Sequence, residues 1–153
     1  MIRLRWICLS IVIKMNFKTW DQSLAPMNDA QAQEIKTFVD DQIVKERRKI
    51  IKKQDLFMIG LRKNVRYAGS NDTDIGLAPY DVFTKKVAVC GGYSNLYKAM
   101  LNAAGIPAIY VIGWAGGQGH AWNLVYADGK LVFILILHGE FPILTTILAP
   151  DVK

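Results

Sequence analysis

The chain of 153 residues is long enough for one domain with its own hydrophobic core. Apolar residues make up 52% and charged residues 21%, a globular composition that excludes an intrinsically disordered chain. The longest apolar run, 131–137, suits a buried strand and is too short to cross a bilayer, which excludes an integral membrane protein. The two cysteines, Cys8 and Cys90, exclude a disulfide scaffold and a four-cysteine zinc site.

Positive charge is concentrated in the first part of the chain. Residues 1–66 hold 14 Lys/Arg and 7 Asp/Glu, whereas residues 67–153 hold 5 and 6. Such a basic stripe can attract nucleic acid, an anionic membrane or a cell-wall polymer, but it is usually the solvated face of a helix. Few aromatic residues interleave with it, so we expect no nucleic-acid partner and keep cell-wall association open.

The first residues resemble the start of a secretory signal. Arg3 and Arg5 precede an apolar run over 6–13, which ends at Lys14 without a cleavage-site pattern close behind. This weak signal favours a secreted or cell-surface location.

Apolar spacing and turn residues predict the elements in chain order. Helices are predicted over 29–50, 54–64, 81–86 and 91–104, with a loop over 67–79 that is rich in Gly, Ser, Asn and Asp. Strands are predicted over 108–114, 120–126 and 130–137. The pair Asp128-Gly129 joins the last two strands as a hairpin turn.

Cys90 stands at the start of the helix predicted over 91–104, after the apolar run 87–89. Unpaired N–H groups and the positive end of the helix dipole favour the thiolate there, which is the nucleophilic form of cysteine. Gly91 leaves room for a substrate carbonyl, and the Cys90 N–H is a natural oxyanion donor. A buried structural cysteine fits the same position equally well.

His120 begins a predicted strand directly after a glycine-rich loop. From there it can reach a helix packed across the sheet, and a cysteine–histidine pair is the arrangement that activates a thiol. The only other histidine is His138, so a multi-histidine metal site is not expected. Tyr80 and Trp122 are candidates for lining a cleft, although aromatic residues beside a sheet more often belong to the core.

The run VAVCGGYSNLYKAMLNAAGIPAIYVIGWAGGQGHAWNLVYADGK resembles the bacterial transglutaminase-like domain, a branch of the papain-like cysteine enzymes. The resemblance covers residues 55–133. It implies an α+β fold in which a helix carrying the nucleophilic cysteine packs on an antiparallel sheet carrying the histidine. It also implies Cys90 as nucleophile, His120 as general base and acid, and no metal or other cofactor. The implied substrate is a protein or peptide amide, which is cross-linked to an amine or hydrolysed.

The sequence departs from this family where an aspartate, in a pattern like Asp-x-Thr-Trp, follows the hairpin. Residues 133–139 read FILILHG without an acid, and the nearest carboxylate, Glu140, lies beyond the strand. Loss of that acid is expected to lower activity by several orders of magnitude.

A shift of the reading frame would restore the family pattern. It turns 134–139 into Tyr-Thr-Asp-Thr-Thr-Trp and 57–61 into Val-His-Asp-Trp-Leu. We therefore hypothesise that the segments near 50–60 and from about 131 onward are frame-shifted, which the nucleotide sequence tests.

These observations predict a basic helical segment over 1–54, a transglutaminase-like core over 55–139 and an irregular, non-native tail over 140–153. Two other classes of protein also fit. An inactive transglutaminase-like binding module would have a slow, ordinary Cys90 thiol. A basic nucleic-acid-binding domain would show steep salt dependence. It would also lose binding when its basic stripe is neutralised at Arg47, Arg48, Lys49, Lys52 and Lys53.

Overall fold

The computed structural model describes residues 27–45, 60–115, 118–127, 130–135 and 143–147. Its helices are α2 (Asp29–Lys45), α4 (Pro79–Lys85) and α5 (Cys90–Ala103), and residues 60–64 are also helical. Several features singled out in the sequence lie wholly or partly outside the described residues. These are the N-terminal run 1–26, the basic run 46–53, His138, Glu140 and both segments proposed to be frame-shifted.

Four strands form an antiparallel sheet in the order β3-β4-β5-β6 within the described residues. They are β3 (Ala108–Ala115), β4 (Gln118–Ala127), β5 (Lys130–Leu135) and β6 (Ile143–Ile147). The predicted hairpin is confirmed, because Ala127 pairs with Lys130 across its turn. The tail, predicted to be irregular, instead contributes β6, which pairs with β5. The sequence of β6, Ile-Leu-Thr-Thr-Ile, does not alternate apolar and polar residues, so it gives no strand signal.

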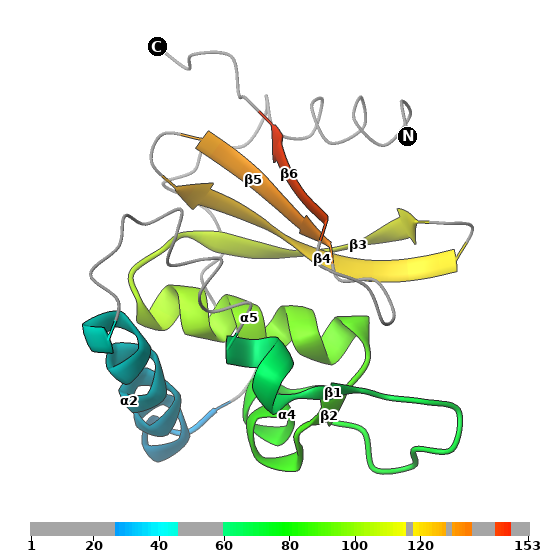
Figure 1. Cartoon of the computed structure of the whole chain (residues 1–153), viewed down its shortest axis with the longest axis horizontal. Coiled ribbons are helices and arrows are strands. Elements are labelled where there is room, and N and C mark those ends of the chain that lie inside the picture. Colours follow the sequence, from blue (N-terminus) through cyan, green and yellow to red (C-terminus); the bar gives the residue numbers. More distant parts are fainter. Residues whose placement is uncertain (1–26, 46–59, 116–117, 128–129, 136–142, 148–153) are drawn as a thin grey trace.

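The helix α5 forms the middle layer of the fold. It packs against β3 and β4 on one side and against α2 and α4 on the other (Figure 1). The helix that begins at Cys90 therefore lies on the antiparallel sheet that carries His120, and the predicted α+β arrangement is confirmed.

Local sequence signals explain where the two longest helices begin and end. The Asn28 side chain accepts the Gln31 N–H at 2.9 Å, and the Gln31 side chain accepts the Asn28 N–H at 3.0 Å. This reciprocal capping starts α2. At the end of α5, Gly105 adopts a φ of 73° and the Ile106 N–H bonds to the Leu101 carbonyl at 2.9 Å. The left-handed residue ends the helix as the Gly-Ile-Pro sequence predicts.

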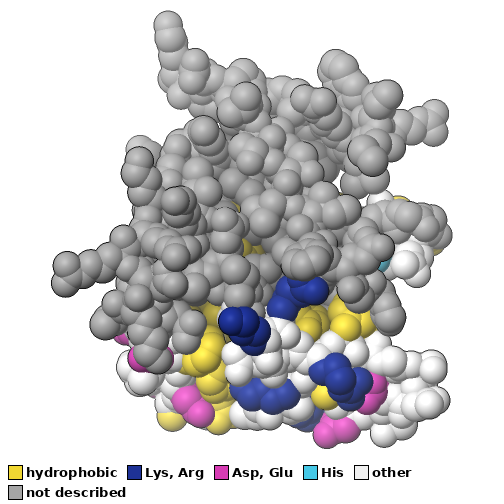
Figure 2. All heavy atoms as spheres, in the orientation of Figure 1, with side chains coloured by type: hydrophobic (Ala, Val, Ile, Leu, Met, Phe, Trp, Pro, Cys, Tyr) yellow, Lys and Arg dark blue, Asp and Glu magenta, His cyan; other side chains and the backbone are white. Residues whose placement is uncertain are grey.

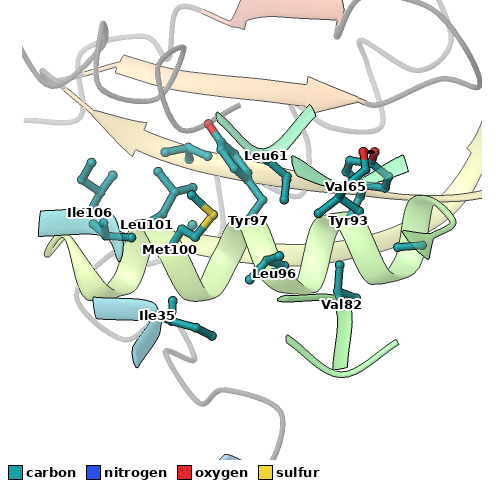
Figure 3. Close-up of a cluster of buried hydrophobic side chains, with 14 residues drawn as sticks. Ile35, Leu61, Val65, Val82, Tyr93, Leu96, Tyr97, Met100, Leu101 and Ile106 are labelled. Atoms are coloured by element: carbon teal, nitrogen blue, oxygen red, sulfur yellow. Dashed lines mark hydrogen bonds between the residues drawn. The ribbon is translucent and has the colours of Figure 1, made fainter. Parts of the chain in front are cut away.

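A single cluster of buried side chains joins the helices to the sheet (Figure 3). The helix α5 contributes five of its fourteen members, and the others come from α2, α4, the segment 60–65, the strands β2, β3 and β4, and Ile106. Each fully buried aliphatic side chain of this kind stabilises the fold by about 1.5–3 kcal/mol. The members are Ile35, Val39, Leu61, Val65, Val82, Ala88, Tyr93, Leu96, Tyr97, Met100, Leu101, Ile106, Ala108 and Val125.

The described surface carries both signs of charge. Figure 2 shows Lys and Arg side chains interspersed with Asp and Glu on one face. Arg66 pairs with Asp72 at 2.7 Å and Lys85 with Asp74 at 2.6 Å. In the part of the chain that the structure describes, no helix combines the length and the apolar character needed to cross a membrane.

Candidate active site

Cys90 is the first residue of α5 and is half-buried, with no disulfide. The preceding residue, Val89, is extended and has no polar side chain, so it gives the helix no side-chain cap. The first N–H groups of a helix have no partner within the helix. The Cys90 N–H instead donates to the Tyr67 hydroxyl at 3.3 Å. Helix geometry therefore brings the thiol and an outward-pointing backbone donor together on one residue.

Two tyrosine hydroxyls border this end of α5. Tyr67 lies on β1 (Arg66–Tyr67), which pairs in parallel with β2 (Val87–Ala88), and its ring stacks on Tyr93 with centroids 5.8 Å apart. Burial, followed by the charge of Cys90, raises the pKa of Tyr67. The same two causes raise the pKa of Tyr110 on β3. Both phenols keep their protons at neutral pH, and the pKa of each is raised in part by the charge of Cys90.

The glycines after Cys90 permit close packing. A Cβ on Gly92 would lie 2.3 Å from the Gly76 carbonyl oxygen, so only glycine fits there without a backbone shift. A Cβ on Gly91 would lie 3.2 Å from the Tyr110 hydroxyl and 3.3 Å from a methyl group of Leu77. Gly92 thus seats the start of α5 against the preceding loop, and Gly91 lets the Tyr110 hydroxyl and Leu77 lie close to the backbone beside the thiol.

His120 lies near the start of β4, opposite Gly113 of β3, and is only 6% exposed. Its Nδ1 atom is buried and has no hydrogen-bond partner in the described structure. Further along β4, the Asn123 amide donates to the Ser94 carbonyl of α5 at 3.1 Å. This bond ties the strand to the helix. Both β4 and α5 begin at the same end of the fold (Figure 1).

The two sequence-predicted catalytic residues lie at this end without forming a pair. Side chains alternate along a strand, so His120 and Trp122 share one face of β4, whereas Asn123 on the other face bonds to α5. No hydrogen bond joins Cys90 to His120 among the residues that the structure describes. No Asp or Glu side chain is bonded to His120 among these residues either.

The other candidates have different surroundings. Tyr80 donates its hydroxyl to Glu34 of α2 at 2.8 Å, which links α4 to α2. Trp122 is 4% exposed, and a Cβ on Gly113 would lie 2.3 Å from its ring. These contacts give both residues packing roles. The sequence analysis missed Tyr67, because a two-residue strand inside a Gly/Asn/Asp-rich segment carries no periodic signal.

The described residues offer no cluster of three or more His, Cys, Asp or Glu side chains that could hold a metal ion. The groups that the structure places at this end of the fold are a thiol, an imidazole, two phenols and backbone N–H groups.

The chain is similar in sequence to known proteins. A sequence model of the transglutaminase-like superfamily matches residues 36–133. Kyphoscoliosis peptidase from Mus musculus is 31% identical over 64 residues, which make up 34% of this chain and 10% of that protein.

Solved structures share the fold. A proposed cysteine protease from Cytophaga hutchinsonii superposes with a TM-score of 0.65 at 22% identity, covering 90% of this chain and 48% of that one. The periplasmic domain of TgpA from Pseudomonas aeruginosa gives a TM-score of 0.58 at 17% identity, covering 80% of this chain and 49% of that one. The chain thus spans about half the length of these two structures.

Proposed function

Because the chain belongs to the transglutaminase-like superfamily, we propose that it transfers the acyl group of a protein or peptide amide through a thioester on Cys90. The observation that supports this most is the position of Cys90, which opens α5 and directs its own N–H group out of the helix. A nucleophile in that position has an oxyanion donor built into its backbone.

The proposed reaction proceeds in two steps. His120 takes the proton of the Cys90 thiol, and the sulfur attacks the carbonyl carbon while the oxygen accepts the Cys90 N–H. The C–N bond then breaks, and His120 returns the proton to the leaving amine. A second amine or a water molecule attacks the thioester, gives a proton to His120 and releases the Cys90 thiol.

The proposal requires the start of β4 to turn His120 from the face that it shares with Trp122 toward the Cys90 sulfur when substrate binds. Catalytic hydrogen bonds are often poorly aligned without substrate and form only in the complex. The buried, unpartnered Nδ1 atom is the position at which a triad acid would accept a hydrogen bond. Because no acid fixes which imidazole nitrogen of His120 carries the proton, we expect acyl transfer to be slow.

Alkylation by iodoacetamide tests the pair directly. In a Cys8→Ser background, we expect Cys90 to react at least about tenfold faster than free cysteine at pH 6.5. The advantage should disappear in His120→Ala. Equal rates for Cys90 and free cysteine would contradict the proposal.

An inactive binding module is the second candidate. The lack of a hydrogen bond between Cys90 and His120 favours it. An ordinary alkylation rate, together with binding of an anionic cell-wall polymer that weakens with salt, is the result that this alternative predicts.

A further inference from the structure

The Tyr67 hydroxyl occupies the point at which the Cys90 N–H is directed. The nitrogen and the phenol oxygen are 3.3 Å apart. In acyl transfer through a thiol, the N–H of the nucleophile points at the oxygen that becomes negatively charged. The phenol oxygen of the unliganded protein therefore lies next to the position that the substrate oxygen would take.

The elements that lead into α5 hold the Tyr67 ring in place. Tyr67 pairs with Ala88 of β2, only two residues before Cys90, and the Ala68 N–H bonds to the Ala88 carbonyl at 2.9 Å. The ring stacks on Tyr93 at an interplanar angle of 21°, and the Tyr93 hydroxyl donates to the Val65 carbonyl. The phenol is thus fixed relative to the start of α5 by strand pairing below it and by a ring beside it.

We propose that Tyr67 supplies the second oxyanion donor of the site. This role rests on the acyl transfer proposed above. The substrate oxygen takes the Cys90 N–H from the phenol oxygen, and the Tyr67 O–H turns to donate to the same oxygen. The new C–S bond pushes the carbonyl electron pair onto oxygen, which accepts both hydrogen bonds. Tyr67 transfers no proton, because His120 supplies the one that leaves with the amine.

The surroundings of Tyr67 favour donation of a hydrogen bond by its hydroxyl group. Burial and the neighbouring Cys90 charge raise its pKa, so the phenol stays protonated over the pH range in which a thiolate forms. A donor held in place before the reaction needs little reorganisation when charge develops.

Tyr110 provides a matched comparison. It is also a phenol with a pKa raised by burial and by Cys90, and its oxygen lies 3.2 Å from the position of a Cβ on Gly91. The Cys90 N–H, however, bonds to Tyr67. Removing either hydroxyl therefore changes the surroundings of the thiol, but of these two hydroxyls only that of Tyr67 bonds to the Cys90 N–H.

Two reactions of Cys90 separate the oxyanion role from an effect on the thiol. Acylation by p-nitrophenyl acetate passes through an oxyanion, whereas alkylation by iodoacetamide does not. In a Cys8→Ser background, we expect Tyr67→Phe to lower the ratio of acylation to alkylation rate by about 10²–10³-fold. Tyr110→Phe should leave this ratio unchanged. Near-ultraviolet circular dichroism checks that Tyr67→Phe, which retains the stacked ring, keeps the fold.

Each outcome decides between the proposals. An unchanged ratio in Tyr67→Phe overturns the donor role, while acylation that still depends on Cys90 and His120 leaves the acyl-transfer function standing. An equal fall of both rates assigns Tyr67 to the thiol and also overturns the donor role. If the parent protein is acylated no faster than free cysteine, the acyl-transfer function is contradicted, and the donor role of Tyr67 is contradicted with it.

Discussion

Asp72 holds the loop that follows Tyr67 through three hydrogen bonds. Its carboxylate accepts both Arg66 guanidinium nitrogens, at 2.8 and 2.7 Å, and the Gly69 N–H at 2.7 Å. These bonds, led by the one from Arg66, lower the pKa of Asp72 to about 2. The residue thereby fixes the strand that carries the proposed oxyanion donor.

The depressed pKa of Asp72 predicts a pH dependence. A carboxyl with a folded-state pKa below its unfolded value of about 3.9 stabilises the fold above that value and loses the effect as pH falls toward 2. The free energy of unfolding of the parent should therefore exceed that of Asp72→Asn at about pH 6. Urea denaturation at about pH 6 and 2.5 measures the difference, which water screening keeps small. A difference that is the same at both pH values would contradict this account.

At the scale of elements, periodic signals identified the long segments. The helix predicted over 29–50 is described as α2 through Lys45, and the one predicted over 91–104 is α5. The two-residue strands β1 and β2 were missed, because parallel pairing of Arg66 with Val87 leaves no pattern in two residues. Tyr67 was missed for the same reason, because the pairing of β1 with β2 is what brings Tyr67 close to Cys90.

The site was predictable only as far as local motifs reach. Cys90 at a helix start follows from the apolar spacing of the helix, and His120 near a strand start follows from the glycine-rich loop before it. Whether the two side chains meet depends on strand register and on the face that each residue occupies, and short motifs carry neither. The missing acid is likewise visible in sequence, whereas the unpartnered Nδ1 atom of His120 is visible only in the structure.

The shifted reading of 134–139 indicates where an acid can be restored. It places its aspartate at position 136, directly after Leu135, the last residue of β5. A carboxylate there would supply the acid that the family pattern has after the hairpin. We expect Ile136→Asp to raise the rate of Cys90 acylation by p-nitrophenyl acetate at least about tenfold, since loss of the triad acid costs about 10⁴-fold elsewhere.

Ile134→Asp is the control for this substitution. Ile134 lies on β5 and pairs with Asn123, so the same charge is added two residues earlier, where the shifted reading has no acid. An equal gain in both variants would point to a general charge effect, and no gain in either would contradict an oriented Cys90–His120 site. Thermal unfolding of both proteins shows whether the added charge has destabilised the sheet.

At the scale of the whole molecule, α2 belongs to the same core as α5. Ile35 of α2 is 1% exposed and Val39 is fully buried, and both lie in the cluster that surrounds Leu101. Loss of the Ile35 side chain should therefore weaken the fold as a whole. We expect Ile35→Ala to lower the free energy of unfolding by about 2–5 kcal/mol in urea denaturation.

The neighbouring residue Lys36 supplies the control, because its side chain is exposed and pairs with Asp40 on the same helix. Lys36→Ala should change the free energy of unfolding by less than about 0.5 kcal/mol. Circular dichroism and Cys90 alkylation, followed over one urea series, should give coincident transitions that both move in Ile35→Ala. If the segment 1–54 instead folded apart from the core, Ile35→Ala would shift the helical signal and leave the transition in Cys90 alkylation where it is in the parent. Coincidence would mean that the thiol owes its position to a core reaching from α2 to the sheet.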